Sequence, residues 1–272
     1  MKNISFGQYY PAQSLIHRLD ARAKVILAFL YIVCSFLCKN IISFAVLALS
    51  AILLILLSNI PLRAVFRAIR PILFVMLFTV VLNVFWTKGE SPLFSWGILS
   101  VYAEGLYNAL FMLIRIVSLI IGTSIFMTYT TTPIELADAI EQLLAPLKRM
   151  RLPVHEFSMM MTVALRFIPT LIEETEKITA AQKARGADFS SGGLVKRAKA
   201  LIPILIPLVI SAFRRADELA TAMECRCYRG GDGRTKLHVL HYGAKDFLMM
   251  VAVILFGAIL VGLNMLSIGY SM

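Results

Sequence analysis

Long and nearly uncharged apolar stretches constrain the fold of this chain more than any other feature of its sequence. A helix that crosses the hydrocarbon layer of a bilayer needs about 20 mostly apolar residues and must satisfy its backbone hydrogen bonds internally. Five stretches approach this requirement, at about 25–38, 41–58, 71–86, 105–127 and 247–268, although the first is short. Because 59% of the residues are apolar and only 16% are charged, we predict an all-α polytopic membrane protein with about five transmembrane helices.

Positive charge gives the predicted orientation of these spans. Short loops that are rich in Lys and Arg stay on the cytoplasmic side of a membrane. Basic residues gather ahead of the first stretch, between the second and the third, and throughout residues 128–242, whereas the other two links hold little net positive charge. We therefore predict a multi-pass protein of the cell membrane with a cytoplasmic N-terminus. Lipid headgroups, rather than nucleic acid, then account for the formal charge of +11.

Three parts of the chain follow from this pattern. We predict a membrane domain with four spans at 1–127, a cytoplasmic or interfacial helical insertion at 128–242, and a last transmembrane helix at 243–272. The insertion is too long for a linker and too apolar for a disordered tail, so it should fold against the membrane domain or against a partner.

Three helices are predicted within the insertion. The first starts at Pro133 with Thr132 as its cap, the second starts near Val154 and passes through Pro169, which should kink it, and the third covers about 194–224. The apolar run 201–213 in the third helix could be a sixth span. Because it contains two prolines and is flanked by basic residues, we favour a helix that lies along the cytoplasmic boundary of the membrane.

The two long helices of the insertion end in the same pattern. A small residue, an arginine and a second small residue form Ala184-Arg185-Gly186 in one and Cys225-Arg226-Cys227 in the other, and in both an alanine stands three positions before the first small residue. Small side chains let another backbone come close, and a guanidinium can bridge to carboxylates or carbonyls on that neighbour. The duplication favours a pair of protein-docking tips over two merely solvated helix ends.

With these motifs the chain resembles a known family, the T subunits of energy-coupling factor (ECF) importers, also called the EcfT or CbiQ family. The resemblance rests on His17-Arg18-Leu19-Asp20-Ala21-Arg22-Ala23-Lys24, on Ala184-Arg185-Gly186, and on residues 222–230 followed by Arg234-Thr235. It covers essentially the whole chain. The sequence departs from the family pattern at Cys225 and Cys227, where the family has Ala and Gly, and at Ala21, where Pro is expected.

The resemblance implies a role without catalysis. Arg185 and Arg226, with their small neighbours, would insert into two cytoplasmic ABC-type ATPase subunits that bind ATP and magnesium, and this chain would need no cofactor of its own. The long helices would hold a substrate-binding membrane protein, the S subunit. That separate chain would select the substrate, for which a vitamin and a cobalt or nickel ion are both open.

Two further features have more than one interpretation. Arg115 is the ionisable residue that lies well inside a predicted span, where it either pairs with carbonyls of the helix bundle or contacts the S subunit. The run Met159-Met160-Met161 is either core packing or an adaptable binding surface, since thioether side chains repack easily against different partners.

A self-contained permease or a membrane enzyme is the alternative function. A permease would normally carry acids or histidines in its spans for ion coupling, and the insertion shows no nucleophile with an evident base. The segment 230–235 lacks the Gly-Lys-Ser/Thr end of a phosphate-binding loop. Cys225 and Cys227 are separated by one residue, which is not the usual zinc spacing, so we predict no metal site with His238 and His241.

Overall fold

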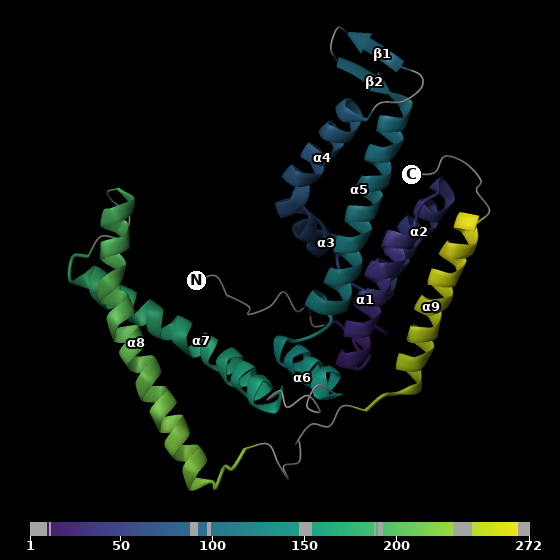
Figure 1. Cartoon of the computed structure of the whole chain (residues 1–272). Helices are drawn as coiled ribbons and strands as arrows, with labels where there is room; N and C mark the ends of the chain where they lie inside the picture. The colour runs from purple at the N-terminus through teal and green to yellow at the C-terminus, as the bar shows by residue number, and fades with distance from the viewer. Residues whose placement is uncertain are drawn as a thin grey trace. The chain divides into compact units, whose positions relative to one another are not determined.

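The computed structural model describes residues 10, 12–87, 92–96, 99–146, 154–187, 189, 193–230 and 241–265. The chain divides into two compact units. The first, called the membrane unit below, comprises Met1–Ala139 and His238–Met272, and the second, the coupling unit, comprises Ile140–Leu237. Nearly all described residues are helical, as the sequence predicts (Figure 1).

The membrane unit is built mainly from helices that pack side by side. Its elements are α1 (Ala21–Leu37), α2 (Ile41–Ser58), α3 (Leu62–Ile69), the 3-10 turn η1 (Arg70–Ile72), α4 (Leu73–Trp86), α5 (Ala103–Thr123), the π-helix η2 (Ser124–Tyr129) and α9 (Ala244–Met265). A short antiparallel hairpin, β1 (Pro92–Trp96) and β2 (Leu99–Tyr102), lies between α4 and α5 (Figure 1). This hairpin was not predicted, because the charge of the link between those spans carries no information on strands.

Four helical segments of the described residues are long and apolar enough to cross a membrane. They are Ile41–Ser58, Leu62–Trp86, Ala103–Tyr129 and Ala244–Met265. The predicted first span corresponds to α1, which has 17 residues and does not reach this length. The predicted third span begins earlier than expected, at Leu62, since η1 carries the helix past Pro71 instead of letting it start there. The run 201–213 is not among the four.

In the core of the membrane unit, α5 packs against α1, α2 and α4, and α1 also packs against α9. Gly122 of α5 permits one close approach, since a Cβ atom there would lie 2.3 Å from the ring of Tyr31. Phe44 of α2 stacks on Phe111 of α5 with ring centroids 4.6 Å apart. Cys34 and Cys38 are buried free thiols. By contrast, only 6% of the α3–α4 window is buried, which fits a surface that faces lipid.

The coupling unit contains two long helices. These are α7 (Val154–Ala184) and α8 (Leu194–Cys225), with 31 and 32 residues, and their bounds agree with the prediction. They contact one another, and the guanidinium of Arg215 forms an ion pair with Glu174 at 2.8 Å. Both helices continue through their internal prolines. The shorter α6 (Pro133–Leu144) connects the two units along the chain and starts where the sequence predicts.

Candidate functional site: two arginine tips

The first candidate tip is formed by the end of α7. The N–H of Gly186 donates to the carbonyl of Lys183 at 3.0 Å, and the N–H of Ala187 donates to the carbonyl of Gln182 at 3.0 Å. Gly186 has a φ of +87°. These bonds and this left-handed residue define a Schellman motif, in which Arg185 occupies the C-cap position. Gly186, directly after the C-cap, is the left-handed residue that ends α7.

The second candidate tip repeats this geometry at the end of α8. The N–H of Cys227 donates to the carbonyl of Glu224 at 2.8 Å, and the N–H of Tyr228 donates to the carbonyl of Met223 at 3.0 Å. Cys227 has a φ of +55°. Arg226 is thus the C-cap residue, as Arg185 is in the first tip. The repeated residue pattern predicts two similar helix ends, but it does not predict the left-handed conformation of a cysteine.

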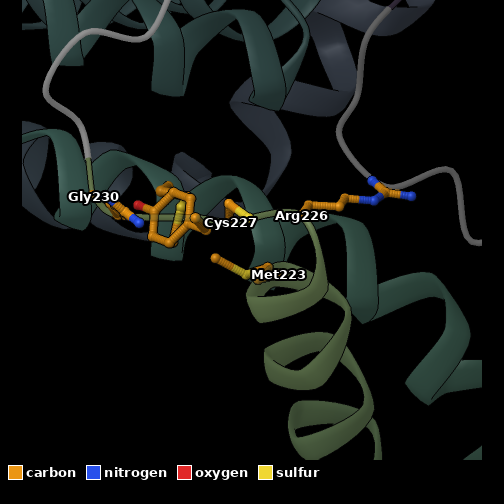
Figure 2. Close-up of a pocket in the computed structure, with 7 residues that line it drawn as sticks. Met223, Arg226, Cys227 and Gly230 are labelled. Carbon is orange, nitrogen blue, oxygen red and sulfur yellow. The ribbon is translucent and has the colours of Figure 1, made fainter.

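All six residues of the two tips are exposed in the structure. An arginine at a helix C-terminus carries its positive charge next to the negative end of the helix dipole, which stabilises the helix end. In Figure 2 the side chain of Arg226 extends away from Met223, Cys227 and Gly230. The tips therefore present exposed arginines on rigid helix ends.

A cavity of about 470 Å³ adjoins the second tip. The residues that line it are Met159, Met223, Arg226, Cys227, Tyr228, Arg229 and Gly230 (Figure 2). It combines thioether and thiol side chains with two arginines, which suits contact with a protein surface better than a small reactant. In the described parts of the chain, no group of three or more His, Cys, Asp or Glu side chains could hold a metal ion. His238, part of the zinc site considered above, lies outside the described residues.

The methionine run lies largely on the surface of the coupling unit. Met160 and Met161 are 58% and 42% exposed, and the neighbouring Phe157 is 55% exposed. Within the coupling unit, Met160 and Met161 therefore lie on the surface and not in a core. Met159 is partly buried and lines the cavity at the second tip.

Arg115 lies within the membrane unit and contacts the turn between α1 and α2. Its guanidinium donates to the carbonyl of Cys38 at 2.9 Å. The same guanidinium lies 5.2 Å from the ring centroid of Phe44 and 5.9 Å from that of Phe36. These contacts support the interpretation in which Arg115 pairs with a carbonyl of the bundle, and the aromatic faces stabilise its charge.

Comparison with known proteins agrees with these features. The sequence profile of CbiQ, described as "Cobalt transport protein", matches residues 12–239. A protein of Ruminiclostridium cellulolyticum named "Energy-coupling factor transporter transmembrane protein EcfT" is 51% identical over 94% of this chain and 95% of its own length. A protein of Bacillus subtilis with the same name is 46% identical over 96% of this chain and 98% of its own length.

The match extends along both units and includes the two tips. Identity near one half over almost the full length of each protein is far above what a shared set of apolar spans would give by itself. The chain therefore belongs to the CbiQ family, among the transmembrane components of energy-coupling factor transporters.

Proposed function

We propose that this chain is the non-catalytic T subunit that couples two cytoplasmic ABC-type ATPases to a substrate-binding S subunit in the cell membrane. The observation that carries this proposal is the identical termination of α7 and α8. Each helix ends in a Schellman motif with an exposed arginine at the C-cap. Two equivalent tips on one chain suit two equivalent partners, as a pair of ATPase subunits would be.

Each tip has the chemistry of a docking contact. The arginine would bridge to carboxylates or carbonyls in a groove of the ATPase, and its small neighbours would let the backbones approach closely. ATP and magnesium would be bound by the ATPases, and this chain would contribute no reacting group. ATP binding would bring the two ATPases together, and Arg185 and Arg226 would move with them.

The long helices would transmit this motion. At a rise of 1.5 Å per residue, the 31 and 32 residues of α7 and α8 make helices about 47 Å long, comparable with the thickness of a bilayer. The exposed Phe157, Met160 and Met161 offer an apolar, adaptable surface for the S subunit. The substrate would be a micronutrient, either a vitamin or a cobalt or nickel ion, selected by the S subunit. The N-terminus would be cytoplasmic, on the side of the ATPases.

The test is purification of the tagged full chain from its native membrane in mild detergent, followed by mass spectrometry of its partners. We expect two ABC-type ATPase subunits and at least one small membrane protein. Removing an arginine that anchors an interface typically weakens binding by about 2 kcal/mol or more, which is roughly 30-fold. The double variant Arg185→Ala and Arg226→Ala should therefore lose both ATPases and retain the membrane partner.

Arg214→Ala is the matched control, because Arg214 is an exposed arginine of α8 outside the tip. It should retain every partner. Size-exclusion chromatography of each variant separates loss of binding from loss of fold. Recovery of both ATPases with the double variant, in wild-type amounts, would contradict the docking role.

A further inference from the structure

The coupling unit is joined to the membrane unit at two places along the chain. Within the membrane unit, residues 129–132, called the exit segment, run from the end of η2 to α6, which leads to the coupling unit, and residues 242–246 at the start of α9, called the return segment, follow the coupling unit in the chain. The first turn of α1 and its cap, also in the membrane unit, contact both of these segments. The charged residues of this turn belong to the motif 17–24. The docking proposal assigns no role to this motif.

Asp246 binds the return segment to α1. One oxygen of its carboxylate accepts the N–H of Asp20 at 2.8 Å, and the other accepts the N–H of Gly243 at 2.7 Å. The side chain is buried, with 4% exposure. The guanidinium of Arg22 lies 4.0 Å from the centroid of the Tyr242 ring and pairs with Asp20 at 2.8 Å. Paired polar groups therefore hold the return segment against the start of α1.

Lys24 binds the exit segment to α1. Its ammonium donates to the carbonyl of Thr130 at 2.7 Å and to the carbonyl of His17 at 3.1 Å. Lys24 and Thr130 are each 2% exposed. Burying an ammonium group costs free energy unless the group is paired. The two hydrogen bonds of Lys24 therefore compensate for its burial. Acidic groups face it from α1, α6 and α9, namely Asp20, Glu135 and Asp246.

The exit segment connects η2 to α6. It follows a π-helix, a conformation that is rare and occurs often at functional sites. The hydroxyl of Tyr129 donates to the carbonyl of Ala64 at 2.8 Å, and the carbonyl of Tyr129 accepts the N–H of Tyr10 at 3.1 Å. At the end of the exit segment, Thr132 forms a reciprocal capping box with Glu135, and this box starts α6.

We propose that Lys24 and Asp246 are positioning residues that lock the exit and return segments to the first turn of α1. The first turn of α1 thereby acts as one joint for the two segments of the membrane unit that precede and follow the coupling unit in the chain. A displacement imposed on the coupling unit then reaches α1 and α9 instead of being lost in loose connections. This inference rests on the proposed coupling function, and it concerns residues outside both docking tips.

The test uses the complete complex, purified with each variant chain and reconstituted in liposomes. The transported probe is chosen from radiolabelled vitamins and radioactive cobalt and nickel ions, as the compound whose uptake is lost when the gene is deleted. Three quantities are measured: the ATPase subunits recovered, the ATP hydrolysed, and the uptake per ATP. Arg18→Met serves as the matched control, because Arg18 lies in the same motif and its side chain is exposed.

Lys24→Met and Asp246→Ala should retain both ATPases and continue to hydrolyse ATP, while uptake per ATP falls at least about tenfold. Asp246→Asn should fall between Asp246→Ala and the wild type, because it keeps one oxygen acceptor. Lys24→Arg, which keeps the donors, should recover part of the uptake that Lys24→Met loses. Arg18→Met should behave as the wild type.

Unchanged uptake per ATP in Lys24→Met or in Asp246→Ala would overturn the proposal. So would a loss of uptake that only follows the amount of folded complex recovered, since this would indicate a purely structural role. Failure of the docking proposal looks different. In that case Arg185→Ala and Arg226→Ala, assayed in parallel, would keep the ATPases and wild-type uptake.

Discussion

Gly186 and Cys227 occupy the same left-handed position in two copies of one helix-ending motif. Their φ angles are +87° and +55°. Glycine adopts this conformation without steric cost, whereas a residue with a Cβ atom is disfavoured there by about 1 kcal/mol or more. The end of α8 therefore carries a conformational cost that the end of α7 does not.

Cys227→Gly is expected to stabilise the end of α8 by about 1 kcal/mol, and Gly186→Ala to destabilise the end of α7 by a similar amount. Because nothing lies within 4 Å of a Cβ atom at Gly186, the second effect would be conformational and not steric. Hydrogen exchange at the last turns of α7 and α8 measures both changes. Faster exchange at the end of α8 in Cys227→Gly would contradict the assignment of a shared motif.

The exposed thiols of the second tip provide a direct probe of docking. Cys225 and Cys227 are exposed, whereas Cys34 and Cys38 are buried. A maleimide should label the first two in the isolated chain and leave the other two unmodified. In the assembled complex, labelling of Cys225 and Cys227 should fall at least about tenfold if an ATPase covers this tip. Equal labelling in the two samples would show that the tip stays uncovered.

The helices and the tip residues could be predicted from the sequence because their signals are local. Pro133 and Thr132 mark the start of α6, and the arginine pattern marks the ends of α7 and α8. The joint could not be predicted in this way. Asp20 and Asp246 are 226 positions apart, and the partner of Lys24 on the exit segment is a backbone carbonyl, which leaves no trace in residue type.

The first span illustrates a different limit. Hydropathy starts it after Lys24, because a lysine disfavours the centre of a bilayer. The structure instead starts α1 at Ala21, where Asp20 caps the helix by accepting the N–H of Arg22 at 2.8 Å. Lys24 thus belongs to the helix and is buried by protein, which apolar periodicity alone does not reveal.

The contact between Gly122 and Tyr31 allows a prediction about packing. Adding a Cβ atom at Gly122 would bring it within 2.3 Å of the buried Tyr31 ring. Gly122→Ala should lower the free energy of unfolding by about 1–3 kcal/mol through overpacking between α5 and α1. Tyr31→Leu creates space at the same contact, so the double variant should lose less than the sum of the two single variants. Thermal unfolding in detergent measures each variant, and strict additivity would argue against this contact.

The last prediction concerns the pH dependence of stability at Lys24, which lies ahead of the apolar stretch of α1. Burial lowers its pKa from the ordinary 10.5 to about 8, although Glu135, Asp20 and Asp246 act in the opposite direction. Between these two values the unfolded chain binds more protons than the folded chain, so the free energy of unfolding rises with pH. Below about pH 8 the full cost of burying the charge is present.

The rise should amount to at most about 3 kcal/mol between pH 8 and 10.5. The difference between the melting temperatures of the wild type and of Lys24→Met, measured across this range, isolates the contribution of Lys24. Other groups near the site, including Arg22 and Tyr242, are present in both proteins and cancel in the difference. The melting temperature of the wild type should therefore gain on that of Lys24→Met as the pH increases. Parallel curves would mean that Lys24 titrates near its ordinary pKa and that its ammonium is not desolvated in the joint.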